Sequence, residues 1–166
     1  LLYPGIGLLE TAMSVGRGTD TPFEVIGAPY IDDVKLANRL NALGQPGVRF
    51  IPIRFTPDYS VHKDKPCGGV NIIVTDRHKL RAVPLGIDIA RVLHKLYPKS
   101  FPLAKVGRLL CHPPTIEALD QGESLAHIEA LCRRAADLSA PVVRIFTAYE
   151  HPNFPPPSLI ATLREA

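Results

Sequence analysis

The hydrophobic positions of the chain repeat with the period of an amphipathic helix in several segments. After Asp32 and Asp33, which suit a helix N-terminus, apolar residues recur at helical spacing up to Gly44, a common helix stop. A stronger apolar stripe covers residues 84–96 and ends at Tyr97. Shorter stripes predict three more helices, at residues 106–111, 115–119 and 124–138.

Runs of apolar and β-branched residues predict the strands. The clearest run is 69–75, which is almost entirely apolar. Residues 47–55 alternate between two faces and predict a strand, and Pro52 places it at a sheet edge or marks a bulge because proline cannot donate a ladder hydrogen bond. The short apolar run 5–9 is predicted to be a buried strand that carries Glu10 at its tip. Two further strands are expected, within residues 23–31 and 141–149.

Strands and helices alternate along the chain, but the first elements are joined by loops. This order predicts a mixed α/β (α+β) fold, with helices packed on a partly antiparallel sheet. The 17 prolines are about twice the number expected at an average usage of roughly 5%, and they indicate short elements. Residues 1–150 are predicted to form one domain and residues 151–166 a proline-rich tail. Because the chain opens at Leu1 without a methionine, we interpret it as a piece of a longer protein.

The composition excludes several classes of protein. With 46% hydrophobic and 21% charged residues, the chain has the usage of a globular domain. The net charge of +3 does not indicate nucleic acid or an anionic membrane as partner, and no apolar run approaches the roughly 20 residues of a membrane span. Cys67, Cys111 and Cys132 are too few for a disulfide scaffold. The six histidines show no metal-ligand spacing, so no metal or other cofactor is expected.

The segment from Glu10 to Glu24 holds the densest cluster of candidate functional residues. Gly16 and Gly18 flank Arg17, and they allow the backbone to bend sharply and approach a ligand. Arg17 offers a planar fork of donors, while Glu10 and Asp20 offer carboxylates; such mixtures bind polar ligands, including sugars. An alternative interpretation is a tight structural loop held by an internal Arg17–Asp20 ion pair.

A second candidate cluster, Asp76-Arg77, follows the strand at residues 69–75. The carboxyl end of a strand is a common place for functional side chains in α/β proteins. The alternative is that Asp76 caps the next turn and that Arg77 lies in solvent. Five aromatic residues are candidates for stacking on sugar faces, although at least three of them are expected in the core: Tyr3, Phe23, Phe50, Phe55 and Tyr59.

Taken together, these segments resemble the DUF1343 (YbbC/NamZ-like) family. The similarity covers about residues 3–130, and several separate motifs in the right order make it specific. They are Tyr3-Pro4-Gly5, Leu9-Glu10, Ser14 to Glu24, Ile26-Gly27-Ala28-Pro29, Gly47-Val48-Arg49-Phe50, Phe55-Thr56-Pro57, Cys67-Gly68-Gly69-Val70, Val74-Thr75-Asp76-Arg77 and Leu96-Tyr97-Pro98.

The resemblance implies a C-terminal auxiliary domain of an exo-β-N-acetylmuramidase, a glycoside hydrolase of bacterial peptidoglycan turnover. Family members have an N-terminal Rossmann-like catalytic domain, which this chain lacks, and a cleft between the two domains. By position in the motifs, Glu10 would be the catalytic carboxylate on this side, and Arg17, Asp20, Asp76 and Arg77 would bind substrate. The substrate would be a muramyl sugar or peptidoglycan fragment, whose lactyl carboxylate suits an arginine. The resemblance also implies an extracytoplasmic location.

One departure from the family pattern supports a different function. Family members read Glu-Gly-Thr-Asn before the Ser-x-Gly-Arg-Gly run, whereas here Glu10 is followed by Thr11-Ala12-Met13, which is one residue shorter. The alternative is therefore a carbohydrate-binding or interaction module that has lost hydrolysis. A self-sufficient enzyme of another chemistry is a third hypothesis, but the chain shows no complete catalytic constellation. On either of the first two hypotheses the chain alone is expected to be inactive.

Overall fold

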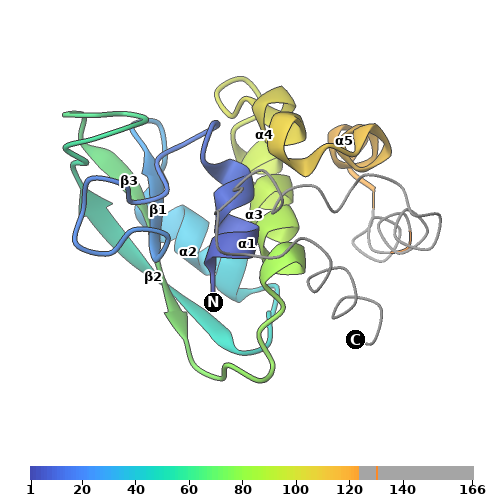
Figure 1. Ribbon diagram of the computed structural model, residues 1–166, viewed down its shortest axis with the longest axis horizontal. Coiled ribbons are helices and arrows are strands. Elements are labelled where there is room, and N and C mark those ends of the chain that lie inside the picture. The colour runs from blue at the N-terminus through green and yellow to red at the C-terminus, as the bar shows by residue number, and fades with distance from the viewer. Residues whose placement is uncertain (124–129, 131–166) are drawn as a thin grey trace, which may run out of the picture.

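A computed structural model describes residues 1–123 and residue 130 of the chain. A small sheet forms one side of the molecule, the helices pack beside it, and the last two helices lie farthest from the sheet (Figure 1). This arrangement confirms the mixed α/β fold. The predicted helix at 124–138, the predicted strand at 141–149 and the proline-rich tail at 151–166 lie outside the described residues, apart from residue 130.

The sheet has three antiparallel strands in the order β1-β3-β2, namely β1 (Val25–Ala28), β2 (Val48–Phe55) and β3 (Cys67–Val74). All three were predicted from the apolar runs. The alternation predicted for β2 is confirmed at residues 48–51, where Phe50 is buried opposite Ile72 while Arg49 and Ile51 are exposed. Beyond them it is wrong, because Pro52 is exposed and Ile53 is half-buried. The apolar run at 69–75 corresponds to β3, which is the central strand of the sheet.

Strand β2 is an edge strand, as Pro52 predicts. Its outer edge contacts the side chain of Asn41, at the end of helix α2 (Asp33–Asn41). The Asn41 amide accepts a hydrogen bond from the Phe50 N–H at 3.0 Å and donates one to the Phe50 carbonyl at 2.8 Å. The amide therefore occupies the place that a backbone unit of another strand would take.

The four helices predicted between residues 32 and 119 are confirmed, with shifted ends. The Asp32 carboxylate caps α2 by accepting a hydrogen bond from the Lys35 N–H at 2.8 Å. The longest helix, α3 (Ala82–Leu96), begins two residues earlier than its apolar stripe. Two short helices follow, α4 (Leu103–Leu110) and α5 (Pro113–Asp120), and the prolines that separate them lie in the first turn of α5.

The strand predicted at residues 5–9 is wrong. The segment forms a short helix, α1 (Tyr3–Ile6), which continues into a 3₁₀ turn, η1 (Gly7–Leu9). Pro4 suits the first turn of a helix, and the apolar residues also recur at helical spacing. These are Leu2, Ile6, Leu9 and Met13, all of them buried. Glu10 consequently lies at the end of a 3₁₀ turn and not at the tip of a strand.

Helices α1 and α3 cross at two glycines. A Cβ on Gly5 would lie 1.7 Å from the Ala82 carbonyl oxygen, and a Cβ on Gly86 would lie 2.2 Å from the Gly5 carbonyl oxygen. Only hydrogen atoms fit between the two backbones at this point. The close approach fixes α1, and with it the start of the candidate site, against the longest helix of the domain.

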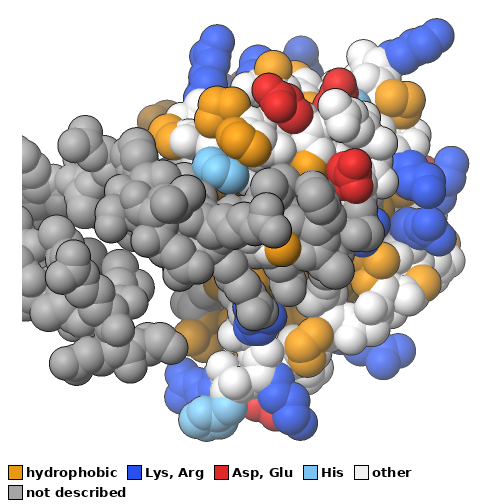
Figure 2. Space-filling model, turned by 90° about the vertical axis from the view of Figure 1, so that its right-hand side faces the viewer, with side chains coloured by type: hydrophobic (Ala, Val, Ile, Leu, Met, Phe, Trp, Pro, Cys, Tyr) orange, Lys and Arg blue, Asp and Glu red, His pale blue; other side chains and the backbone are white. Residues whose placement is uncertain are grey.

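The surface is mixed in character. On the face shown in Figure 2, the described hydrophobic, basic and acidic side chains are interspersed, in keeping with the small net charge. Within residues 1–123, no helix has the length and apolar character needed to cross a membrane.

Candidate functional site

The loop between η1 and β1 carries the first candidate cluster, and backbone contacts give it a defined shape. Ser14 and Gly27 form an antiparallel bridge, which ties the loop to β1. Gly16 and Gly18 both have φ of 77°, and the Thr19 N–H donates to the Gly16 carbonyl at 3.1 Å. A side chain at either glycine would be strained. The two glycines therefore form the turn that presents Arg17.

Arg17 and Glu10 form an ion pair in which the Arg17 Nε–H donates to Glu10 Oε1. The Arg17 side chain is 37% exposed and that of Glu10 28%, so the pair lies at the surface and is not sealed inside. The hydrogen bond to Glu10 raises the pKa of Arg17, which keeps the guanidinium charged. The internal Arg17–Asp20 pair considered as an alternative does not form in the described structure, where Asp20 is exposed.

Two aromatic rings complete the cluster around Arg17. The Arg17 Cζ lies 5.0 Å from the centroid of the Phe23 ring, within the range of a cation–π contact. The Tyr3 ring meets Phe23 edge to face, with centroids 4.7 Å apart. Tyr3 belongs to α1 and remains 44% exposed. Residues from α1, η1 and the following loop thus meet at one surface, which we call the Arg17 cluster (Tyr3, Glu10, Arg17 and Phe23).

A third segment borders the cluster, through a contact that no pattern in the sequence predicts. The Asp58 N–H donates to the Gly18 carbonyl at 3.0 Å, and a Cβ on Gly18 would lie 2.3 Å from the Tyr59 backbone nitrogen. The Tyr59 side chain is 65% exposed. Neither sequence spacing nor periodicity relates residues 58 and 18, because the contact depends on the path of the long β2–β3 connection.

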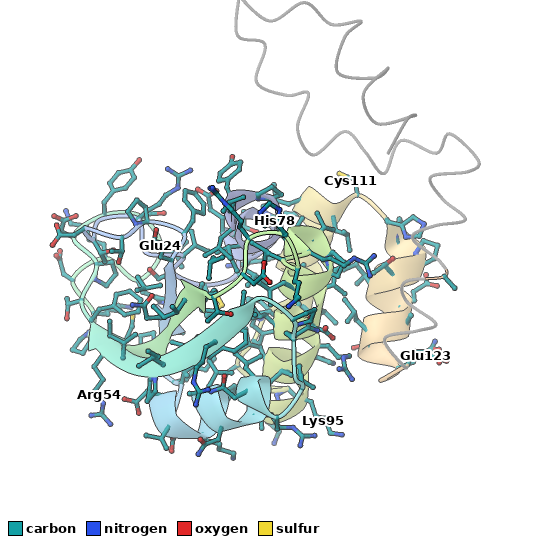
Figure 3. All side chains as sticks on the ribbon, turned by 90° about the horizontal axis from the view of Figure 1, so that it is seen from below. Glu24, Arg54, His78, Lys95, Cys111 and Glu123 are labelled. Carbon is teal, nitrogen blue, oxygen red and sulfur yellow. The ribbon has the colours of Figure 1, made fainter. Side chains whose placement is uncertain are left out.

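The second predicted cluster does follow β3, but its contacts are local. Asp76 accepts a hydrogen bond from the His78 N–H at 2.9 Å and pairs with Lys79 Nζ at 3.1 Å, which lowers the pKa of Asp76. Arg77 is exposed. These contacts match the capping role that was considered as an alternative for Asp76. Figure 3 places Glu24 and His78 on the side of the molecule opposite to Arg54 and Lys95.

The structure therefore joins two of the five predicted site residues directly, Glu10 and Arg17. Within residues 1–123, no hydrogen bond or ion pair links Asp20, Asp76 or Arg77 to that pair. The expectation that at least three of five aromatic residues belong to the core is wrong, since only Phe50 is fully buried. The others are half-buried or exposed: Tyr3, Phe23, Phe55 and Tyr59.

The remaining reactive side chains do not assemble a second centre. Cys67 is buried, and burial raises the pKa of its thiol, as expected of a small packing residue. Cys111 is exposed at the end of α4. In the described part of the chain, no three His, Cys, Asp or Glu side chains gather closely enough to hold a metal ion.

The Arg17 cluster belongs to an open surface. One hollow of about 830 Å³ lies between α2 and α3, and another of about 370 Å³ lies between α2 and the start of β2. Neither is lined by any of the five predicted site residues. An exposed guanidinium, a carboxylate and aromatic rings on an open face can bind one side of a polar ligand, and a facing surface has to enclose the other side.

Comparisons with known proteins agree on one family. The family model described as "Exo-beta-N-acetylmuramidase NamZ, C-terminal" matches residues 1–138. The chain is 46% identical over 107 residues to the peptidoglycan beta-N-acetylmuramidase NamZ of Bacillus subtilis (strain 168), an alignment that covers 64% of this chain and 26% of that protein.

Two solved structures of DUF1343 family proteins from Bacteroides fragilis NCTC 9343 are similar in fold. The match to the first has a TM-score of 0.59 at 25% identity, and it covers 90% of this chain and 41% of the chain of that structure. The match to the second has a TM-score of 0.57 at 24% identity, and it covers 82% of this chain and 36% of the chain of that structure. The chain thus spans about a quarter of the curated relative and about two fifths or less of the solved proteins.

Proposed function

This chain belongs to the family of C-terminal domains of the exo-β-N-acetylmuramidase NamZ, and from this premise we propose that it lines the substrate cleft of a peptidoglycan hydrolase and binds terminal N-acetylmuramic acid. Membership confirms the resemblance found in the sequence, and it makes the chain one part of a larger protein. The role of individual residues is our proposal, which depends above all on the geometry of Arg17.

The way in which Arg17 is held supports a carboxylate as its ligand. Glu10 accepts from Nε only, and neither Nη atom hydrogen-bonds to another described residue. The edge of the guanidinium that carries Nη1 and Nη2 is thus available for two parallel hydrogen bonds to a carboxylate. N-acetylmuramic acid carries a lactyl carboxylate, which distinguishes it from N-acetylglucosamine. We propose that Arg17 recognises this group.

Hydrolysis of a glycosidic bond requires two carboxyl groups on opposite sides of the bond. We propose that Glu10 is the carboxylate contributed by this chain. Because its Oε1 accepts a hydrogen bond from Arg17, we assign it the role of general base or nucleophile, and we assign the proton donor to the N-terminal Rossmann-like domain outside the chain. Asp20, Asp76 and Arg77 are proposed as further substrate contacts, which the open face would offer once that domain covers it.

The test is hydrolysis of a chromogenic N-acetylmuramide by the full-length protein and its Arg17→Ala variant. Two charge-assisted hydrogen bonds are together worth about 3 kcal/mol, so kcat/KM should fall by about 10²-fold. Arg17→Lys should recover little of the loss, since an ammonium group cannot form the paired contact. Arg108→Ala, which removes an exposed arginine from α4, is the matched control. The proposal fails if Arg17→Ala behaves like the control.

The competing candidate is a binding module without catalysis, and the shortened segment after Glu10 favours it. In that case the protein would bind N-acetylmuramic acid in an Arg17-dependent manner, measured by calorimetry, but would not hydrolyse the chromogenic substrate. Retention of hydrolysis by the full-length protein would exclude this candidate.

The proposed substrate also predicts the cellular compartment of the protein. Peptidoglycan lies outside the cytoplasmic membrane, so we propose an extracytoplasmic location for the full-length protein. Fractionation of the bacterial source, followed by detection with an antibody to this domain, tests this location; recovery in the cytoplasmic fraction would contradict it.

A further inference from the structure

We propose that Phe23 is a positioning residue, which acts through Arg17 and determines how tightly the site binds an anionic sugar. This inference rests on the proposed function of Arg17. It adds a residue whose role follows from neither the sequence pattern nor the family match. Three observations carry it: the backbone conformation of Phe23, the contacts of its ring and the directions in which Arg17 remains open.

The first observation is that Phe23 adopts a left-handed backbone conformation, with φ of 66°. Bulky residues rarely occur there, because the Cβ approaches the following carbonyl. Two other positions of the same loop adopt positive φ, and both are glycines, Gly16 and Gly18. At both glycines an added Cβ would also clash with neighbouring atoms, whereas position 23 has room for a side chain and holds an aromatic ring despite the strain. The ring is therefore the feature that this position requires.

The second observation is the surroundings of the ring. The Phe23 N–H donates to the Val15 carbonyl at 2.7 Å, which anchors the backbone at the base of the loop. From this anchor the ring reaches between Arg17 and Tyr3, at 5.0 Å from the Arg17 Cζ and 4.7 Å from the Tyr3 centroid. The ring is half-buried: it packs against the hydrophobic core and also contacts the Arg17 guanidinium.

The third observation concerns which sides of the Arg17 guanidinium are occupied and which side can bind a ligand. Glu10 occupies the Nε side, and the Phe23 ring lies beside the guanidinium, with its centroid 5.0 Å from Arg17 Cζ. A long, flexible side chain held at two points loses little further freedom when a ligand binds. The edge with Nη1 and Nη2 then points in a fixed direction. Phe23 thereby contributes to affinity for a carboxylate without touching the carboxylate.

The experiment measures competitive inhibition of the full-length protein by two sugars, N-acetylmuramic acid and N-acetylglucosamine. In Phe23→Leu, the inhibition constant for N-acetylmuramic acid should rise about 10-fold, equivalent to about 1.4 kcal/mol. The constant for N-acetylglucosamine, which lacks the carboxylate, should stay within about 2-fold. For the substrate, KM should rise while kcat changes little, as expected when binding is weakened before the reaction step.

Two further variants separate the ring from the backbone strain. Phe23→Tyr keeps the aromatic face and should retain affinity close to that of the parent protein. Phe23→Asn suits a left-handed backbone but removes the ring, so it should weaken binding at least as much as leucine does. Phe101→Leu is the matched control, because Phe101 is a buried aromatic residue of the segment before α4.

The outcomes distinguish this inference from the function on which it rests. If Arg17→Ala leaves the inhibition constant for N-acetylmuramic acid unchanged, the proposed function and the inference both fail. If Arg17→Ala weakens binding but Phe23→Leu and Phe23→Asn match Phe101→Leu, only the inference fails. Equal losses for the two sugars in the Phe23 variants would also overturn it, since the effect would then be a general loss of structure.

Discussion

At the scale of single residues, the candidate site was partly predictable. The glycines around Arg17 indicated a turn that presents a guanidinium, and the structure has that turn. The partner of Arg17 was not predictable from spacing, because residues 11–16, which connect it to Glu10, form irregular turns in which no helix or strand period applies. The supporting role of Phe23 was equally hidden, since nothing in the local pattern signals a left-handed aromatic residue.

Replacing Glu10 by glutamine separates its chemistry from its contact with Arg17. The amide oxygen can still accept from Nε, so the position of Arg17 and the KM for an N-acetylmuramide should change little. Loss of an acid–base carboxylate should lower kcat by about 10²–10⁴-fold in the full-length protein. Glu117→Gln, on the exposed side of α5, is the control. A change in kcat no larger than that of the control would leave Glu10 with only its structural contact to Arg17.

The environment of His62 predicts how the stability of the fold depends on pH. Burial and the nearby charges of Lys65 and Lys105 lower its pKa, so the folded protein favours the neutral ring. The unfolded chain takes up the proton first, so stability is full above about pH 6.5 and falls as the pH drops below that value. His62→Asn suits the left-handed backbone at this position, where φ is 65°.

Urea unfolding at pH 5 and pH 7.5 measures this effect. The parent protein should lose more stability between the two values than His62→Asn does. The lowered pKa values of Asp33 and Asp76 act below about pH 4, so these carboxyl groups do not obscure the comparison. An equal loss in both proteins would contradict the assignment of His62.

At the scale of elements, the period of the apolar residues predicted the helices and strands that pack against the core. It did not predict the one segment whose packing depends on a close approach of two helix backbones. Helices α2 and α3 and all three strands follow from apolar spacing and end signals. The segment 5–9 was misread because its run of apolar residues is too short to distinguish a strand from a buried helix. Its glycine at position 5 meets Gly86 from a helix 80 residues away, and no local rule connects the two.

The crossing of α1 and α3 can be tested with Gly86→Ala. The added methyl group would lie 2.2 Å from the Gly5 carbonyl oxygen. The helices must then separate, and we expect a loss of about 3 kcal/mol in the free energy of unfolding. At Gly107 in α4, a Cβ would meet only the Ile116 side chain at 3.2 Å. Gly107→Ala should therefore be neutral or slightly stabilising. Equal stability of the two variants by urea unfolding would contradict a tight crossing.

At the scale of the whole molecule, the sequence indicated correctly that the chain is one part of a larger protein. The family match and the short span relative to known members support the same conclusion. The chain has a core of its own, yet its Arg17 cluster faces outward on an open surface. Under the proposed function, a second domain completes the site, so this chain needs to hold only part of the catalytic residues; the incomplete set found in the sequence is in keeping with that proposal.

The contacts at the outer edge of β2 have a consequence for how copies of the molecule meet. The Phe50 backbone is already satisfied by the Asn41 amide, and Pro52, two residues further along the same edge, has no N–H to offer. A second molecule therefore cannot extend the sheet in register at this place, which keeps concentrated protein from forming intermolecular β-structure. The double variant Asn41→Ala, Pro52→Val should self-associate in light scattering where the parent stays dispersed; unchanged scattering would show that the edge needs no such protection.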